Sequence, residues 1–216
     1  MKIFFRIILR FFGFFIRGLG RLSHLIFNPD LSRNLSFVFN VLYSGRISRS
    51  LKLSGKNLLI SYPLYLLGGK NISIGDNFIS YSRLRLEAHT SFLTQIFNPI
   101  LSIGNNVAIN YDCHIGCINK VIIGDNVLIA SKVFITDHFH GNTTKDIIGT
   151  PPSQRKLISK GPVIIENNVW IGENVSIMPN VIIGENSIIG ANSVVTKSVP
   201  KNTVVAGIPA IIIKTI

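Results

Sequence analysis

The stretch VIIENNVWIGENVSIMPNVIIGENSIIGANSVVTKSVP, residues 163–200, repeats a pattern that is six residues long. An apolar β-branched residue returns at every sixth position: Ile165, Ile171, Ile177, Ile183, Ile189 and Val195. An amphipathic helix needs apolar spacings of three and four, so a spacing of six indicates short strands separated by turns. Such units cannot close a core alone, and we therefore expect them to stack into a solenoid with the apolar column inside.

The same step occurs earlier in the chain. It passes through Ile103, Ile109 and Ile115, slips by two residues at NKVI (119–122), and resumes through Ile123, Ile129 and Ile135. Tetrads of the IGDN type recur beside it, and their Gly, Asn and Asp favour tight or left-handed backbone turns. These tetrads stand at 74–77, 103–106, 123–126, 171–174 and 183–186. The sequence therefore predicts an all-β solenoid over most of the chain, with Cys113 as a compact core residue.

The repeat is interrupted between Ile135 and Val163. We expect residues 136–162 to form an extended loop at a corner of the solenoid, and long excursions of this kind in compact domains are usually functional. The loop contains His138 and His140, two of the five histidines in the chain. Because the ordinary pKa of histidine is close to neutrality, a histidine in such a loop is a candidate general base.

Three features occur in the order in which one protein family carries them: the six-residue repeat, the block at 169–200, and the ending VVAGIPA at 204–210. On these features, residues Leu51 to Lys214 resemble the hexapeptide-repeat acyltransferases. The resemblance implies a left-handed parallel β-helix with three hexads to a coil, although parallel crossovers are usually right-handed. It also implies acetyl-CoA as acyl donor and a homotrimer with active sites between subunits. The chain is most similar to sugar O-acetyltransferases, particularly those acting on bacterial surface polysaccharides (O-antigen or capsule) or their lipid-linked precursors.

The family carries a histidine in its loop at the position of His138, and Gly141 follows it here. The resemblance implies that His138 is the general base, which deprotonates a hydroxyl as that hydroxyl attacks the thioester, without a covalent enzyme intermediate. Asp137 is a candidate for orienting the imidazole, with a turn-forming Asp as the alternative. His140 is either a sugar contact or an ordinary loop histidine.

Further site residues follow from the same family positions. Trp170 is expected near the reacting centre and Asn110 near the acceptor, although a corner aromatic and a turn Asn would explain them equally well. The resemblance places the donor along five residues: Gly172, Ala191, Thr196, Lys197 and Lys214. Ile208 and Ile211 depart from the family pattern, in which a polar and a basic residue are common. We therefore expect fewer contacts to CoA at its nucleotide end.

The N-terminal segment combines large apolar residues with cations. When each residue advances the helix by about 100°, the cations fall within an arc of about 100°: Lys2, Arg6, Arg10, Arg17 and Arg21. The longest stretch before Arg17 without Lys or Arg is 11–16, far short of a membrane span. Residues 1–28 therefore predict a basic amphipathic helix in a membrane interface; packing on its own domain or on a partner is the alternative. We expect residues 29–50 to form a connecting segment and residues 51–216 to form the acyltransferase domain.

Charge is distributed unevenly along the 216 residues. Of the net charge of +12, residues 1–56 carry +9, from ten Lys and Arg against Asp30 alone, which leaves +3 for the rest. A nearly neutral body argues against a nucleic-acid-binding protein, which concentrates basic residues on its folded surface. The chain has two cysteines, too few for a disulfide framework. We expect a cytoplasmic protein that is peripheral on the inner face of the cytoplasmic membrane.

Two other functions remain open from the sequence. Left-handed β-helices also host a zinc-dependent hydro-lyase activity of the carbonic-anhydrase type, for which His114, His138 and His140 are the candidate ligands. The spacing of HFH does not match the ligands of that family, and we expect no metal. The second alternative is a non-catalytic membrane scaffold built on the same repeat.

Overall fold

A computed structural model of the chain describes residues 2–26, 28–142, 144 and 147–216. Side chains of residues 2–9, 11, 24–26 and 29 are outside this description. Of the predicted basic stripe, the side chains of Lys2 and Arg6 therefore lie outside the description.

The chain divides into two compact units, Met1–Asn40 and Val41–Ile216. The first unit contains helix α1 (Lys2–Ile26) and the beginning of α2 (Pro29–Ser48), so most of the connecting segment is helical. Within the described residues, no helix combines the length and the apolar character that crossing a membrane requires.

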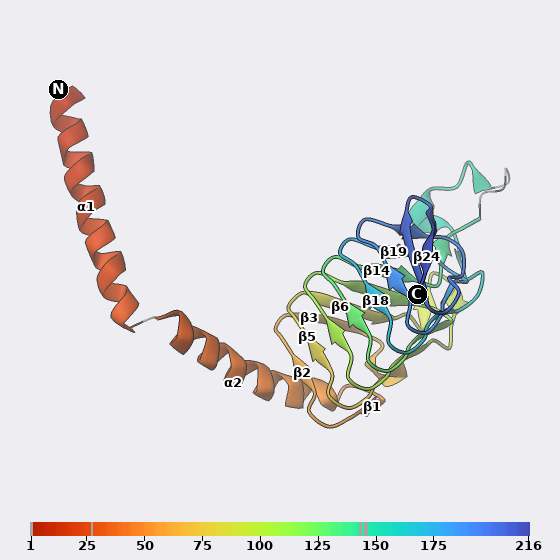
Figure 1. Ribbon diagram of the computed structural model, residues 1–216. Helices are drawn as coiled ribbons and strands as arrows, with labels where there is room; N and C mark the ends of the chain where they lie inside the picture. Colours follow the sequence, from red (N-terminus) through yellow and green to blue (C-terminus); the bar gives the residue numbers. More distant parts are fainter. Residues whose placement is uncertain (1, 27, 143, 145–146) are drawn as a thin grey trace. The chain divides into compact units, whose positions relative to one another are not determined.

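The second unit is a parallel β-helix whose coils stack along one axis (Figure 1). Each full coil contributes one strand to each of three sheets in the described chain. The first sheet contains β1 (Leu53–Ser54), β4 (Ile72–Ile74), β9 (Ile100–Ile103), β12 (Lys120–Ile123), β17 (Val163–Ile165) and β20 (Ile182–Ile183). The second contains β2 (Leu59–Ile60), β5 (Ile79–Ser80), β10 (Ala108–Ile109), β13 (Leu128–Ile129), β18 (Trp170–Ile171), β21 (Ile188–Ile189), β23 (Thr203–Gly207) and β24 (Ala210–Thr215). The third contains β3 (Leu64–Leu67), β6 (Leu84–Ala88), β11 (His114–Cys117), β14 (Phe134–Thr136), β19 (Ser176–Ile177) and β22 (Val194–Val195).

The apolar column lies inside the coils, as the six-residue step predicts. On the second sheet, Ile109 pairs in register with Ile129, Ile129 with Ile171, and Ile171 with Ile189. All four side chains are at most 1% exposed. Burial of each contributes roughly 1.5–3 kcal/mol. Cys113 is also buried in this core, and burial raises the pKa of its thiol to about 11.

A ladder of asparagines follows the corner between the first and second sheets. Seven residues of the described chain stand there in the left-handed region, with φ between 55° and 59°, and each side-chain N–H donates to the next side-chain oxygen over 2.8–3.1 Å. They are Asn57, Asn77, Asn106, Asn126, Asn168, Asn186 and Asn202. Asparagine tolerates this backbone region better than other side chains, and its amide both donates and accepts. The recurring tetrads thus form left-handed corners, as predicted.

The two ends of the β-helix are covered differently. At the start, the last turns of α2 pack on the first coil, where the buried Ser44 hydroxyl accepts a hydrogen bond from the Ile60 N–H over 2.7 Å. At the end, β24 folds back antiparallel on β23. Two antiparallel hairpins of the described chain leave the coils, β7 (Ser91–Phe92) with β8 (Gln95–Ile96), and β15 (Phe139–His140) with β16 (Leu157–Ile158). Short 3₁₀ turns occupy Gly69–Asn71 and Pro152–Gln154.

Asn126 tests the ladder, because it combines a φ of 58° with amide bonds to Asn106 and Asn168. Asn126→Gly removes both hydrogen bonds but still allows a positive φ, and we expect the free energy of unfolding to fall by about 1–3 kcal/mol. Asn126→Ala adds strain in the left-handed region, for a further loss of about 1 kcal/mol. Chemical denaturation monitored by circular dichroism measures both variants. Equal stability of the two variants would contradict the role of the left-handed corner.

Candidate active site

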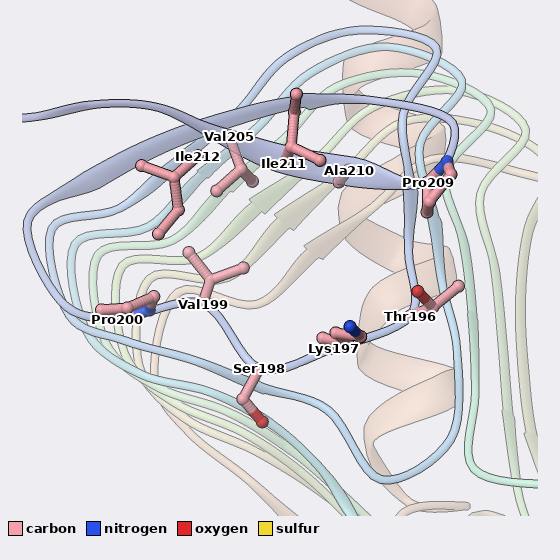
Figure 2. Close-up of a pocket in the computed structure, with 10 residues that line it drawn as sticks. All are labelled: Thr196, Lys197, Ser198, Val199, Pro200, Val205, Pro209, Ala210, Ile211 and Ile212. Carbon is pink, nitrogen blue, oxygen red and sulfur yellow. The ribbon is translucent and has the colours of Figure 1, made fainter.

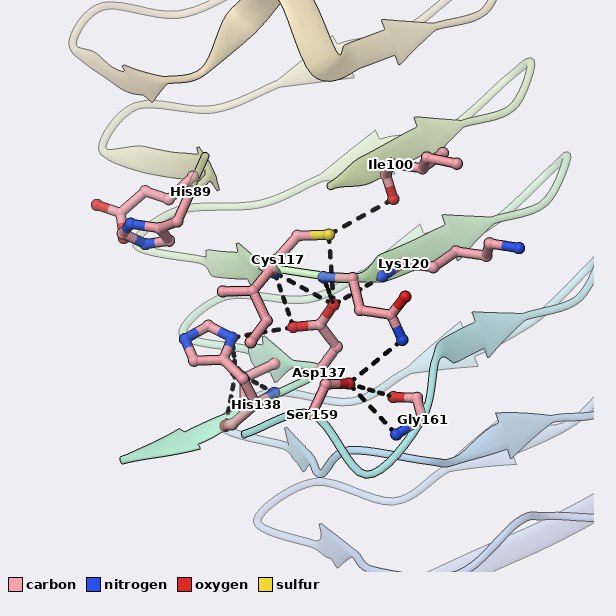
Figure 3. A network of polar contacts seen from close by, with 12 residues as sticks. His89, Ile100, Cys117, Lys120, Asp137, His138, Ser159 and Gly161 are labelled. Carbon is pink, nitrogen blue, oxygen red and sulfur yellow. Dashed lines mark hydrogen bonds and ion pairs between the residues drawn. The ribbon is translucent and has the colours of Figure 1, made fainter. Parts of the chain in front are cut away.

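The side chains of His138 and Asp137 form a dyad directly after β14 (Figure 3). His138 Nδ1 stands 2.9 Å from Asp137 Oδ1, and the Thr136 hydroxyl lies 3.2 Å from the same ring nitrogen. The Asp137 side chain is fully buried, whereas that of His138 is 12% exposed. A carboxylate that accepts from Nδ1–H fixes the tautomer in which Nε2 carries a lone pair. An imidazole in this tautomer can accept a proton at Nε2.

Asp137 is held by successive backbone N–H groups at the turn from β11 to β12. Ile118 N donates to Oδ1 over 3.0 Å, while Asn119 N and Lys120 N donate to Oδ2 over 2.7 and 2.8 Å. This turn is the place where the repeat slips by two residues. Burial acts to raise the pKa of Asp137, but the hydrogen bonds from His138, Ile118 and Asn119 outweigh it and hold the pKa below its usual value. The carboxylate is therefore ionised at neutral pH.

The ring of His138 lies against the backbone of β11. A methyl group added at Gly116 would stand 3.3 Å from His138 Cε1 and 3.7 Å from His114 Nε2, so the two rings approach the same glycine. The ring of His89 stands edge-on to that of His138, with centroids 5.9 Å apart (Figure 3). Gly116 thus leaves space for the rings of His138 and His114, and the ring of His89 lies beside that of His138.

A second polar cluster adjoins these rings on the third sheet. Glu87 Oε2 lies 3.0 Å from His114 Nε2 and 3.5 Å from His89 Nε2, and Oε1 lies 2.8 Å from Arg85 Nη2. Sequence reasoning did not assign this carboxylate. The available signal was the alternation of RLRLEAH (83–89) and CHIGC (113–117), which turns Arg85, Glu87 and His114 outward from the coil.

His140 lies apart from the dyad, on the hairpin arm. Its side chain is exposed, and its ring packs against Phe92 of the β7–β8 hairpin with centroids 5.3 Å apart. The same two excursions are joined by Gln95, whose side chain accepts from Leu157 N over 2.7 Å and donates to Leu157 O over 3.1 Å. Within the predicted loop, residues 143, 145 and 146 lie outside the described residues.

Trp170 and Asn110 lie on or beside the second sheet, not on the third sheet that leads to the dyad. Trp170 is on β18 of the second sheet, half exposed, whereas the dyad follows the third sheet. Asn110 lies at the end of β10, and its side chain donates to Ile129 O over 3.0 Å. One chain therefore does not bring these two side chains into a described contact with His138.

The residues predicted to bind acetyl-CoA lie on the C-terminal coils. Gly172 and Ala191 are neighbours, because a Cβ at Gly172 would lie 2.6 Å from Ala191 N, and Gly172 N is itself bonded to Ile189 O. Thr196 and Lys197 line a hollow of about 340 Å³ beneath β24 (Figure 2). Lys214 lies on β24 opposite Val204 and does not line this hollow.

The three histidines named as possible zinc ligands do not form one cluster, because His140 lies apart from the other two. His114 faces Glu87, His138 faces Asp137, and His140 packs on Phe92. Among the residues that the structure describes, no group of three or more His, Cys, Asp or Glu side chains is placed to hold a metal ion.

Comparisons with known proteins identify the family. Residues 162–197 match the model of the bacterial transferase hexapeptide (six repeats) family. WbbJ of Escherichia coli (strain K12), which is assigned to lipopolysaccharide biosynthesis as an O-acetyl transferase, is 42% identical over 159 residues, covering 72% of this chain and 78% of WbbJ. The chain belongs to the hexapeptide-repeat transferases.

A second relative and two solved structures support the same assignment. The galactoside O-acetyltransferase of E. coli is 35% identical, over 75% of this chain and 63% of that relative. A galactoside acetyltransferase solved in complex with coenzyme A matches with a TM-score of 0.54 and 32% identity, over 79% of this chain and 68% of the other. AntD, an N-acyltransferase from Bacillus cereus solved with dTDP-4-amino-4,6-dideoxyglucose and coenzyme A, matches with a TM-score of 0.63 and 25% identity, over 79% and 87%.

Family membership confirms several predictions from the sequence. The fold is the left-handed parallel β-helix, and the chain is an acyltransferase with an acyl-CoA donor. The acceptor, the role of each site residue and the assembly state stay predictions.

Asp137→Asn tests how the dyad is held. The Asn side chain would place its N–H₂ group against the backbone N–H donors that bond Asp137. We therefore expect the free energy of unfolding to fall by about 2–5 kcal/mol at pH 7. Because the pKa of Asp137 is lowered in the folded chain, its contribution is present above the pKa of the unfolded carboxyl, about 4, and is lost as the pH falls through the folded value. Urea unfolding should show that the difference in unfolding free energy between wild type and Asp137→Asn is smaller at pH 3 than at pH 7. A difference that does not change with pH would refute an ionised Asp137 carboxylate.

Proposed function

We propose that the protein is an acetyl-CoA-dependent O-acetyltransferase that modifies a sugar hydroxyl of a bacterial surface polysaccharide or its lipid-linked precursor. The observation that carries the proposal is the dyad: a partly exposed imidazole whose Nδ1 is bound by the buried carboxylate of Asp137. Such an arrangement suits a general base, because the carboxylate fixes the tautomer and stabilises the imidazolium that forms.

The acceptor class is supported by the relatives. WbbJ is assigned to lipopolysaccharide biosynthesis and the second E. coli relative is named for galactosides, so a sugar hydroxyl is the acceptor they have in common. The greater identity to WbbJ favours a surface polysaccharide over a free galactoside. AntD, an N-acyltransferase, is less similar in sequence at 25% identity.

The proposed reaction is a direct transfer. Nε2 of His138 accepts the proton of a sugar hydroxyl while the oxygen attacks the acetyl carbon of the thioester. The tetrahedral intermediate collapses, the C–S bond breaks, and the CoA sulfur takes the proton from the imidazolium. Asp137 holds the ring orientation and offsets its positive charge during the transfer. His138 and Asp137 are thus assigned as base and positioning residue, and no covalent enzyme intermediate forms.

A trimer gives the site its remaining parts. Trp170 and Asn110 lie on or beside the second sheet, whereas the dyad follows the third. In the proposed trimer, a neighbouring subunit brings those side chains to His138. A groove between the two subunits would hold CoA along Gly172 and Ala191, with Lys197 and Lys214 toward its phosphates and Thr196 beside the nucleotide end. His140, on the arm above, is assigned to the sugar.

Helix α1 supports a site at the inner face of the cytoplasmic membrane. Phe12, Phe15, Leu19 and Leu22 are exposed, each by at least half, and residues 1–29 contain no acidic side chain. Apolar side chains entering the headgroup boundary, with cations toward anionic lipid, would hold the enzyme near a lipid-linked acceptor.

His138→Ala tests the base. Thiol release from acetyl-CoA with a panel of polysaccharide repeat units should fall by roughly 10²–10⁴-fold, while thermal stability is unchanged within a few degrees. His140→Ala is the matched variant two residues away, and it should raise KM for the acceptor with a smaller effect on kcat. If His140→Ala abolishes turnover and His138→Ala does not, the base has been misassigned. Retained turnover in both variants would show that neither histidine is the base.

Arg10→Glu, Arg17→Glu and Arg21→Glu together test the membrane role of α1. Each cation near an anionic surface contributes about 1 kcal/mol, so reversing three should abolish flotation of the full chain with vesicles rich in anionic lipid. Turnover of a water-soluble acceptor should stay unchanged. The proposal is contradicted if the wild type and the variant float equally well with anionic vesicles. It is also contradicted if the wild type binds neutral vesicles as well as anionic ones.

A further inference from the structure

The Glu87 carboxylate is fixed in orientation at an outward position of β6. Arg85 donates to Oε1 through Nη2 at 2.8 Å and through Nε at 3.2 Å, and His114 Nε2 lies 3.0 Å from Oε2. Burial acts to raise the pKa of Glu87, but hydrogen bonds from Arg85 and His114 outweigh it and lower the pKa. An ionised carboxylate accepts about four hydrogen bonds. Among the described residues, the remaining position on Oε2 is approached by His89 Nε2, at the long distance of 3.5 Å.

This carboxylate shares both of its histidine neighbours with the proposed base. His89 stands 3.5 Å from Glu87 Oε2, and its ring lies edge-on to that of His138. His114 bonds Glu87 and approaches Gly116, against which the His138 ring also lies. The carboxylate and the base imidazole are therefore one side chain apart on the same face of the β-helix.

The cluster remains accessible and is not required by the core. The side chains of Glu87, His89 and His114 are 16%, 25% and 27% exposed. The residues that pair in register with Glu87 on the neighbouring strands are Leu67 and Gly116. Neither is charged, so stacking of the coils does not require a charged residue at position 87. A preorganised carboxylate beside a base is suited to bind a donor group of the substrate rather than to stabilise the fold.

We propose that Glu87, held by Arg85 and His114, binds a second hydroxyl of the acceptor, adjacent to the hydroxyl that His138 deprotonates. This inference rests on the proposed function and narrows its substrate class: the acceptor is a sugar with a free hydroxyl next to the acetylated position. Glu87 acts as a specificity residue, and its hydrogen bond orients the attacking oxygen toward the thioester. A site built around such a bond discriminates strongly against an analogue that lacks the hydroxyl, because the carboxylate loses its partner.

The test compares acceptors as well as enzymes. A hexopyranoside that the full-length wild type acetylates is assayed beside its monodeoxy analogues, each lacking one hydroxyl other than the acetylated one. One analogue, deoxygenated next to the acetylated position, should lose about 10- to 100-fold in kcat/KM, the range for a hydrogen bond to a charged group. Glu87→Gln should lower kcat/KM for the parent sugar by a similar factor and leave that analogue unchanged, so that the preference between the two disappears.

Asp112→Asn is the matched control. It also converts an outward carboxylate to an amide, breaks an ion pair with Arg83, and places Asn at a φ of 60°, which Asn tolerates. This variant should keep the wild-type preference between parent and analogue.

Two results overturn the inference while leaving the proposed function intact: a wild type indifferent to every deoxygenation, or a Glu87→Gln variant that slows all acceptors by one common factor, as a purely structural role would. A wild type that acetylates no sugar overturns the proposed function, and the inference with it.

Discussion

The left-handed backbone at the corners is the constraint on which the rest of the structure depends. A coil of short strands closes only if the chain turns sharply after each strand, and a positive φ strains most side chains by about 1–2 kcal/mol per residue. Asparagine reduces that strain, and in the ladder from Asn57 to Asn202 each amide also bonds the next. Stacking the corners in register then aligns the strands, and aligned strands place the isoleucine column inside.

The candidate site arises where this regularity fails. The two-residue slip before Ile123 leaves the N–H groups of Ile118, Asn119 and Lys120 pointing at one place, and Asp137 occupies it. Successive backbone donors of this kind form an anion-binding nest. The irregularity in one coil therefore anchors the first residues of the excursion that begins in the next coil, and this contact fixes the imidazole of His138. Asn119 also reaches Ser159 at the end of the excursion, so one turn holds both of its ends (Figure 3).

The three faces of the β-helix carry different chemistry at their outward positions. Apolar residues dominate the second sheet, where Leu128, Trp170 and Ile188 follow each other in register. Ionisable residues gather on the third sheet, where Arg85, Glu87 and His114 lie near the ring of His138. An enzyme of this family can thus vary its outward side chains for substrate while the inward column keeps the coils unchanged.

The sequence by itself determined the β-helix, the position of its interruption and the family, because a six-residue period leaves one class of fold that buries the isoleucines. It also placed His138 and Asp137 in one loop. Only the tertiary structure decided that Asp137 is a buried anchor rather than a turn residue, since its partners lie 17 to 19 residues earlier in the chain. For the same reason Glu87 could not be assigned from sequence. Its partner His114 lies 27 residues away along the chain and is adjacent only because successive coils stack in register, which no local pattern records.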